Sequence, residues 1–211
     1  ADLPVQTDPN NGSNNWAVSG QLTASGKPIL CSDPHLGLNL PSLWFEMQLS
    51  GPNSNAYGAS FPGSPAIIIG FNDSIAWGVT NAGRDVKDFY EVQFKDASMQ
   101  EYMYNGEWKK STFREEKIVV RDQGEKIEKI AMTEWGPVMF DTSYKNMNED
   151  GKYYAVRWTA HDASNELLTF YQLNRAKNHA DYLAATEHFY CPGQNFVFAS
   201  HTGDIAIRQQ G

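Results

Sequence analysis

Alternating hydrophobic and polar positions dominate the first three quarters of the chain. Eight segments rich in β-branched and aromatic residues have strand-like composition, and runs of turn residues such as GPNSN, PGSP and NEDG separate them. The predicted strands are residues 28–33, 42–50, 65–71, 74–80, 89–95, 116–122, 128–135 and 153–158. A further strand is expected at 16–19, directly after the polar run NNGSNN. The pattern predicts a chain built mainly of strands.

Two segments depart from this alternation. Residues 65–71, PAIIIGF, are apolar without a break, which is typical of a strand covered on both faces and predicts layers above and below it. Helical periodicity is confined to residues 163–189, where Ser164 is predicted to cap a first helix and Asn178 a second. A hairpin-like pair of strands, 194–200 and 204–209, follows.

Composition and charge exclude several classes of protein. With 211 residues and 41% hydrophobic content, the chain could form one sizeable core or part of a larger one. The net charge of −8 argues against nucleic acid as a partner, because phosphates require a basic surface. No apolar run approaches the ~18 residues of a membrane-spanning helix. Cys31 and Cys191 match no zinc or redox spacing, and both are expected to be buried free thiols.

The familiar catalytic patterns are absent from the sequence. There is no G-x-S-x-G elbow, no H-E-x-x-H, no P-loop and no G-x-G-x-x-G. The five histidines do not cluster along the chain, so a Ser-His-Asp triad has no local support, although a triad assembled only in space stays open.

One nucleophilic scheme needs no histidine. Cleavage between Gly12 and Ser13 would give Ser13 a free α-amine beside its own hydroxyl. An α-amine has a pKa of about 7.7–8.0, so it can accept a proton near neutral pH. Before the cut, the Ser13 hydroxyl could attack the Gly12 carbonyl, and a residue without Cβ permits the strained backbone that this N-to-O acyl shift requires.

Four stretches in order identify a family that uses this chemistry. GSNNWAVSG, SDPHLGL, PGSPAIIIGFNDSIAWGVTNAGRDVKDFY and CPGQNFVFASHTGDIAI resemble the penicillin acylase family of N-terminal-nucleophile hydrolases. The resemblance implies an α+β chain that is part of a four-layer α/β/β/α sandwich, with helices between Ser164 and Phe189 covering one side. It also implies that residues 1–12 are the remnant of a spacer and that residues 13–211 begin the large subunit of an autocatalytically cleaved precursor.

The implied activity is hydrolysis of a linear amide of an acylated substrate, such as the side chain of a penicillin antibiotic, without a catalytic cofactor. The implied partners are the small subunit and the remainder of the large subunit, without nucleic acid or a membrane span, in the bacterial periplasm or outside the cell. The chain alone is expected to be inactive. One alternative is an acylase for N-acyl-homoserine lactones or lipopeptides. Another class stays open: a secreted, non-catalytic β-rich module that binds glycans through its 13% aromatic residues.

The resemblance assigns catalytic roles to individual positions. Ser13 matches the N-terminal nucleophile; the alternative is a loop serine, since Asn11-Gly12-Ser13 is also a glycosylation sequon. His35 matches a position that orients the serine hydroxyl and amine, with an ordinary turn histidine as the alternative. Asn81 and Ala82 match the stretch whose backbone N–H forms half of the oxyanion hole, and the alternative is a purely structural turn.

Three residues match a calcium site found in part of the family. These are the carboxylates of Asp85 and Asp88 and the backbone carbonyl of Lys87, all hard oxygen ligands of the kind that Ca²⁺ prefers. A solvated acidic turn is the alternative.

Four further residues match positions that line the acyl-chain pocket in the family: Leu36, Ile69, Phe170 and Gln194. Mostly apolar walls would favour an aromatic or aliphatic acyl chain. The alternative for each of them is plain core packing.

Overall fold

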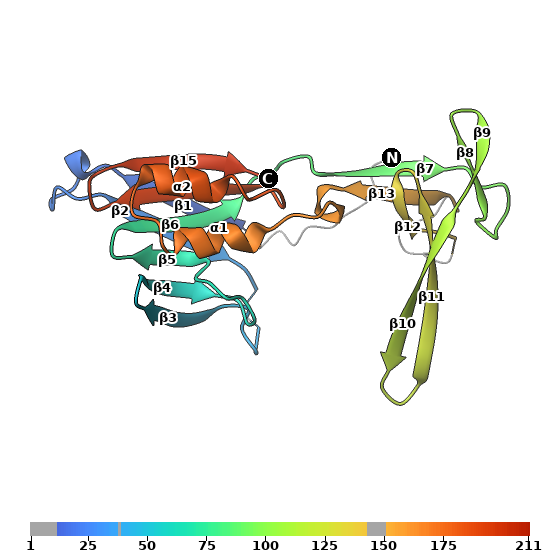
Figure 1. Ribbon diagram of the computed structural model, residues 1–211, viewed down its shortest axis with the longest axis horizontal. Coiled ribbons are helices and arrows are strands. Elements are labelled where there is room, and N and C mark those ends of the chain that lie inside the picture. The colour runs from blue at the N-terminus through green and yellow to red at the C-terminus, as the bar shows by residue number, and fades with distance from the viewer. Residues whose placement is uncertain (1–11, 38, 143–150) are drawn as a thin grey trace. The chain divides into compact units, whose positions relative to one another are not determined.

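The computed structural model describes residues 12–37, 39–142 and 151–211, shown in Figure 1. The chain divides into two compact units. Within the described residues, the core unit comprises 12–86 and 162–211, and the hairpin unit comprises 87–142 and 151–161. The predicted spacer, residues 1–12, lies outside the described residues except for Gly12.

An antiparallel sheet of six strands organises the core unit (Figure 1). In spatial order its strands are β15 (Ile205–Gln210), β14 (Gln194–Ser200), β6 (Ile75–Asn81), β5 (Ile69–Asn72), β4 (Ser54–Ser60) and β3 (Phe45–Gly51). The neighbouring strands β14 and β6 pair along their whole length from Gln194↔Asn81 to Ser200↔Ile75. The predicted C-terminal hairpin is confirmed as β14 and β15, which pair antiparallel.

A second, two-stranded sheet packs on one face of this sheet. It consists of β1 (Gly12–Val18) and β2 (Ile29–His35), antiparallel to each other, with the short 3-10 helix η1 (Gly20–Leu22) between them. The close approach of β2 depends on Gly78 of β6, because a Cβ at that position would lie 2.5 Å from the Cβ of Ser32. Any larger residue would push the two sheets apart.

Two helices cover the other face of the six-stranded sheet, α1 (Glu166–Leu173) and α2 (His179–Thr186) (Figure 1). The predicted cap at Asn178 is confirmed, since its side chain accepts a hydrogen bond from the Asp181 N–H at 2.9 Å. The predicted cap at Ser164 is wrong by one residue. Asn165 caps α1, while the Ser164 hydroxyl donates to Glu166 Oε1.

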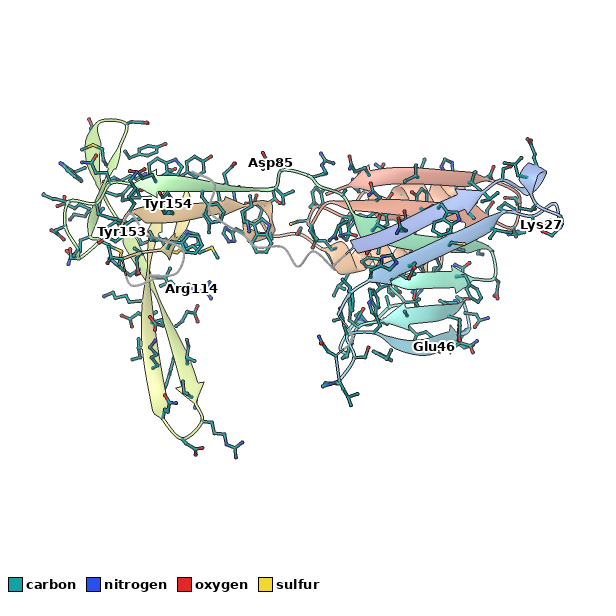
Figure 2. All side chains as sticks on the ribbon, turned by 180° about the vertical axis from the view of Figure 1, so that it is seen from behind. Lys27, Glu46, Asp85, Arg114, Tyr153 and Tyr154 are labelled. Atoms are coloured by element: carbon teal, nitrogen blue, oxygen red, sulfur yellow. The ribbon has the colours of Figure 1, made fainter. Side chains whose placement is uncertain are left out.

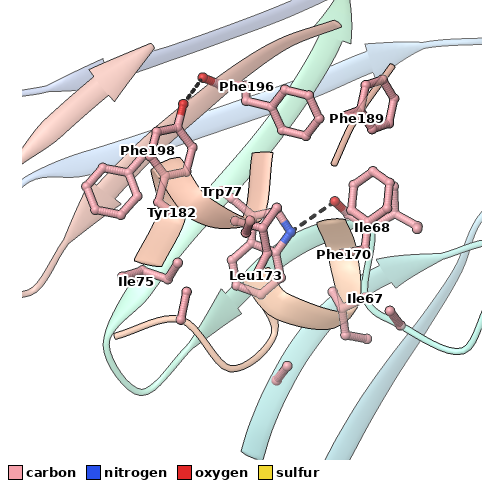
Figure 3. Packing of buried hydrophobic residues seen from close by; sticks show 14 residues of the cluster. Ile67, Ile68, Ile75, Trp77, Phe170, Leu173, Tyr182, Phe189, Phe196 and Phe198 are labelled. Carbon is pink, nitrogen blue, oxygen red and sulfur yellow. Dashed lines mark hydrogen bonds between the residues drawn. The ribbon is translucent and has the colours of Figure 1, made fainter. Parts of the chain in front are cut away.

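The main hydrophobic core lies between the helices and the six-stranded sheet (Figure 3). Its largest fully buried side chains include Trp77 and Phe198 from the sheet and Tyr182 from α2. The polar atoms of these aromatic residues are paired, as the Trp77 indole donates to the Ile68 carbonyl at 3.0 Å and the Tyr182 hydroxyl to the Phe196 carbonyl at 2.8 Å. The core unit thus has three layers, and the predicted strand-rich α+β class with two late helices is confirmed.

The hairpin unit has a sheet of five antiparallel strands and a small separate hairpin. The sheet consists of β10 (Thr112–Val120), β11 (Gly124–Thr133), β12 (Gly136–Phe140), β13 (Tyr153–Trp158) and β7 (Lys87–Val92), in that spatial order. The small hairpin consists of β8 (Glu101–Tyr104) and β9 (Glu107–Lys110), and the 3-10 helix η2 (Thr159–His161) ends the unit. Its core is a small cluster around Val92, Tyr102 and Ala155.

A long β-ribbon extends from this sheet. Strands β10 and β11 pair at nine positions, but β11 pairs with β12 only at Met132 and Thr133. Side chains project from both faces of the ribbon (Figure 2), and many are charged. Ion pairs such as Lys117 with Glu125 join exposed groups across the two strands. The ribbon therefore contributes little to a buried core.

Several predicted strand boundaries change in the structure. The first strand begins at Gly12, not at Trp16, so Gly12 and Ser13 belong to β1. Strands β4, β8, β9 and β12 were not predicted. Of the predicted strand 65–71, only Ile69 onward is a strand, because the Asn174 side chain replaces a neighbouring strand by bonding the Ile67 N–H at 2.9 Å and the Ile67 carbonyl at 2.8 Å.

Both cysteines are free thiols, as expected. Cys191 is buried, but Cys31 is only half-buried, so the expectation of burial is wrong for Cys31. Among the described residues, no helix has the length and apolar character needed to cross a membrane.

Candidate functional site

Ser13 is the second residue of β1 and is half-buried. It pairs with Pro34 of β2, and its hydroxyl donates a hydrogen bond to the carbonyl oxygen of Gly12 at 2.5 Å. Side chains alternate along a strand, so Ser13 faces the same way as Asn15, which contacts the six-stranded sheet. The Ser13 hydroxyl therefore lies beside the peptide group that precedes it, on the inner face of β1.

His35 lies across the two-stranded sheet from the residue before the serine. It pairs with Gly12, and a Cβ built on Gly12 would be 3.8 Å from His35 Nδ1. Its other ring nitrogen, Nε2, is 2.8 Å from Asp33 Oδ2, and both side chains are exposed. Among the described residues, no hydrogen bond joins His35 to Ser13. The structure thus brings His35 next to the Gly12–Ser13 segment, with its ring oriented by Asp33.

Contacts between the two sheets show where Ser13 lies along β6. Three contacts follow one another along β6, at Ala76, Gly78 and Thr80. Leu30 and Ala76 line one cavity of about 370 Å³, and Ser32 lies against Gly78. The side chain of Asn15 accepts a hydrogen bond from the Thr80 hydroxyl. The next inward positions of the two-stranded sheet are those of Ser13 and Pro34. They therefore lie toward Asn81, the last residue of β6.

The backbone N–H groups at the end of β6 differ in their partners. The Ala82 N–H donates to the Gly193 carbonyl at 2.9 Å, which extends the pairing between β6 and β14 by one residue. Because successive N–H groups of a strand point to opposite edges, the Asn81 N–H points away from β14. On that side β5 pairs with β6 no further than Trp77, so no described strand faces Asn81 there. Of the two residues, Asn81 has the N–H directed away from the neighbouring strand.

Polar side chains surround this strand end. The Gln194 amide donates to Asn81 Oδ1 at 2.7 Å, and the Asn195 amide donates to the Asn81 carbonyl at 3.2 Å. Arg84 lies beside them, because a Cβ on Gly193 would be 2.9 Å from the Cβ and Cγ of Arg84. Sequence reasoning singled out Gln194 but missed Asn195. The signal in the sequence was the polar side chain of Asn195, which faces the two-stranded sheet from the mostly apolar strand β14.

The four predicted pocket residues lie in different surroundings. Phe170 is buried in the core beneath α1, with its ring 6.2 Å from that of Phe196, and Ile69 packs against the same core. Gln194 lies at Asn81, while Leu36 follows the end of β2 and is 41% exposed. Ile69 and Phe170 are thus brought into one core, and the other two lie elsewhere in the unit.

The predicted calcium ligands are divided between the two units. Asp85 lies on the segment that follows β6 (Figure 2), whereas Lys87 and Asp88 begin β7 of the hairpin unit. The Lys87 ammonium lies over the rings of Phe89 and Trp158 at 5.5 and 5.8 Å. Within the described ranges, no group of three or more His, Cys, Asp or Glu side chains is arranged to hold a metal ion.

Known proteins resemble this chain in both sequence and structure. Acyl-homoserine lactone acylase QuiP of Pseudomonas aeruginosa is 32% identical over 94% of this chain, and penicillin acylase 2 proenzyme of Pseudomonas sp. strain SE83 is 33% identical over 61%. The matched regions are 25% and 16% of those proteins, so the chain spans about a quarter of the length of the first relative.

The structural likeness agrees with this result. A penicillin G acylase from Alcaligenes faecalis is 26% identical, with a TM-score of 0.80 over 92% of this chain and 34% of that one, which confirms the predicted fold. The sequence profile of the family described as penicillin amidase matches residues 2–211. The chain belongs to the penicillin amidase family.

Proposed function

We propose that this chain carries the nucleophile of an acylase that hydrolyses a linear amide of an N-acylated substrate, and that the nucleophile is Ser13. The observation that carries the proposal is the place of Ser13 at the start of β1. Its hydroxyl lies 2.5 Å from the Gly12 carbonyl oxygen, and it lies toward the end of β6 where the Asn81 N–H points away from its neighbouring strand. Both relatives named above are acylases by name.

The first step is self-cleavage between Gly12 and Ser13. The Ser13 oxygen attacks the Gly12 carbonyl carbon, the C–N bond breaks, and the nitrogen takes up a proton to become the Ser13 amine. The resulting ester is then hydrolysed by water, which leaves a carboxylate on Gly12 and frees the Ser13 hydroxyl. The short contact between the hydroxyl and the Gly12 carbonyl group supports this step, because reacting groups must be held close before reaction.

Hydrolysis of substrate then uses the same serine. The α-amine accepts the proton of the hydroxyl as Ser13 attacks the substrate carbonyl, and it returns the proton to the leaving amine as the amide bond breaks. Water hydrolyses the acyl-enzyme ester and regenerates the serine. With an ordinary pKa of about 7.7–8.0, this amine is a competent base near neutral pH.

We assign the backbone half of the oxyanion hole to Asn81, not to Ala82. The Ala82 N–H already donates to Gly193, whereas the Asn81 N–H is directed away from β14. A fixed N–H donor stabilises the negative charge that develops on the carbonyl oxygen. His35, beside Gly12 and oriented by Asp33, is assigned the task of orienting the Ser13 hydroxyl and amine.

The substrate is proposed to be an acyl amide such as the side chain of a penicillin, with Leu36, Ile69, Phe170 and Gln194 contributing to its pocket. An N-acyl-homoserine lactone is the second candidate, because the relative that matches 94% of the chain is named for that substrate. The two candidates share the chemistry at Ser13 and differ in the acyl chain and the leaving amine.

The remaining proposals concern the whole protein. We propose that the small subunit and the rest of the large subunit complete the site, and that the enzyme works in the periplasm or outside the cell. A structural Ca²⁺ held in part by Asp85, Asp88 and the Lys87 carbonyl is proposed for the assembled enzyme. The proenzyme name of one relative supports a processed precursor.

The test is turnover by the full-length protein. Purified enzyme is offered phenylacetyl, glutaryl and long-chain acyl amides and N-acyl-homoserine lactones, and the released amine is quantified. We expect turnover of at least one class and none with the Ser13→Ala variant. Equal turnover by Ser13→Ala, or none by the wild type on any substrate, contradicts the proposal.

A further inference from the structure

A ring of polar side chains joins the two sheets next to Ser13. The Asn15 amide donates to the Asn195 carbonyl at 3.3 Å, and the Thr80 hydroxyl donates to Asn15 Oδ1 at 3.5 Å. The Asn195 amide donates to the Thr80 hydroxyl at 3.3 Å and to the Asn81 carbonyl at 3.2 Å. Asn15 belongs to β1, Thr80 to β6 and Asn195 to β14, so the ring connects three strands.

These side chains occupy positions where apolar residues are the ordinary choice. They lie on the inner faces of the two sheets, in the same rows as Ala17, Gly78 and Val197. Burying an amide or hydroxyl is unfavourable unless it is hydrogen-bonded, and here each polar side chain has a partner in the ring. The hydrogen bonds of the ring thus fix the relative positions of the three strands. Apolar side chains in the same places would only pack against one another.

The ring belongs to the strands that carry both parts of the proposed machinery. Asn15 is two residues from Ser13 on the same face of β1, about 7 Å along the strand. Thr80 supplies the carbonyl half of the peptide group whose N–H belongs to Asn81, and Asn195 bonds the Asn81 carbonyl on the other side. The ring therefore ties the strand that carries the nucleophile to the peptide group proposed as the oxyanion donor.

We propose that Asn15, Thr80 and Asn195 are positioning residues that hold Ser13 in register with the Asn81 N–H; this inference rests on the proposed function. The ring acts on β1 and on β6, and none of its members reacts with the substrate. Its loss would let the two sheets shift slightly against each other, so that the tetrahedral intermediate and its donor no longer align.

The structure offers two matched pairs of variants. Thr80→Val keeps the shape of the side chain and removes the hydroxyl, whereas Thr80→Ser keeps the hydroxyl. Asn15→Ala removes a ring member, whereas Asn14→Ala alters the preceding residue of β1, which is exposed on the opposite face. Each is made in the full-length protein, and the rate of self-cleavage, kcat, KM, the pH profile and the thermal midpoint are measured.

Thr80→Val and Asn15→Ala are expected to lower kcat by about 10²-fold, since a misplacement of about 1 Å can cost that much. KM and the midpoints of the pH profile should not change, because neither the pocket nor the α-amine is altered. Self-cleavage should slow as well. Thr80→Ser and Asn14→Ala should behave as the wild type.

A merely structural role predicts a different outcome. If Thr80→Val and Asn15→Ala melt at a lower temperature but keep the wild-type kcat and self-cleavage rate, or if only KM rises, the inference is wrong. Should Thr80→Val fail to fold, Asn15→Ala decides, because it only shortens a side chain. A wild type that cleaves itself but turns over no substrate overturns the proposed hydrolysis, and the rate of self-cleavage then decides whether the ring positions Ser13. A wild type that does neither overturns the proposed function and the inference with it.

Discussion

The two faces of strands β6 and β14 differ sharply although both are formed by the same two strands. Alternate side chains point to opposite faces. The face toward the helices carries Trp77, Val79, Phe196 and Phe198, whereas the face toward the two-stranded sheet carries Gly78, Thr80, Asn195 and Val197. The first face carries three large aromatic side chains, and the second has smaller side chains, two of them polar; we call the second the polar face. The difference indicates that one face stabilises the fold and the other positions the candidate site.

Burial explains the composition of the helix face. Trp77, Phe196 and Phe198 are fully buried, and the rings of Tyr182 and Phe198 stack with their centroids 4.7 Å apart. Each such side chain stabilises the fold by about 1.5–3 kcal/mol through burial of apolar surface. On the opposite face the requirement is close approach of the sheets, which Gly78 permits, together with hydrogen bonds across the gap.

The largest effect on activity is expected at Ser13, which belongs to the two-stranded sheet that packs on the polar face. Ser13→Ala should abolish both self-cleavage and hydrolysis, because it removes the only nucleophile of the proposed scheme. Ser13→Cys should keep some self-cleavage, since a thiol can also make the acyl shift. Electrophoresis of the purified full-length variants, with turnover of the best substrate, measures both. A Ser13→Ala precursor that still matures to a chain beginning at residue 13 would exclude self-processing by this serine.

On the helix face, Phe198→Ala should act on stability instead. Replacing a fully buried phenylalanine by alanine leaves a cavity and typically lowers the free energy of unfolding by about 3–5 kcal/mol. Val119→Ala is the control, because Val119 lies on the β-ribbon and is 74% exposed. Urea unfolding of the two variants gives the comparison. Equal midpoints for both variants would show that the helix face does not carry the core.

Tyr182 gives the helix face a dependence on pH. Burial, opposed by the nearby positive charge of Arg208, raises the pKa of the Tyr182 hydroxyl to about 12. In the unfolded chain this group ionises near pH 10, so its contribution is complete below about pH 10 and is lost as the pH rises toward 12. A shift of two units corresponds to about 3 kcal/mol.

Tyr182→Phe isolates this contribution. At neutral pH it should cost about 1 kcal/mol, because the Phe196 carbonyl loses its donor. The difference in unfolding free energy between wild type and variant should then shrink and change sign between pH 10 and 12. A constant difference across that range would show that the hydroxyl is not buried in the folded state.

The smallest effect is expected on the β-ribbon, which belongs to neither face. Lys117 and Glu125 form an ion pair across β10 and β11, but their side chains are 59% and 53% exposed. Exposed pairs contribute about 0.2–1 kcal/mol, so Lys117→Ala should barely move the urea midpoint, even at low salt. A loss comparable to that of Phe198→Ala would mean that the ribbon is part of a buried core.

The sequence predicted strands β6 and β14 and missed elements that depend on distant contacts. The alternation in residues 74–80 and 194–200 corresponds closely to β6 and β14. Strand β4, SNAYGAS, has few residues that favour strands, and it forms because β3 and β5 pair with it on both sides. Pairing partners of this kind leave no local signal.

The segment around Ile67 shows the same limit. Its apolar run predicts burial correctly, since Ile67 is fully buried. It does not predict that the Asn174 side chain, 107 residues away, satisfies the Ile67 backbone in place of a strand. A buried backbone group needs a partner, but the sequence does not show which residue provides it.

The candidate site divides in the same way. The resemblance named Ser13, His35 and Asn81, and two of its choices gain geometric support from neighbouring strands: His35 lies opposite Gly12, and Ser13 lies toward Asn81. Choosing between Asn81 and Ala82 required the hydrogen bond from Ala82 to Gly193. Asn15, Thr80 and Asn195 could not be linked from sequence because their contacts join three strands.

The most direct test of the central claim, that Ser13 of β1 becomes an N-terminal nucleophile beside the polar face of β6 and β14, is N-terminal sequencing of the mature full-length protein together with its intact mass. We expect a large chain that begins SNNWAV, produced from wild-type precursor and absent from Ser13→Ala. A single uncleaved chain, or a cut at any other bond, would contradict it.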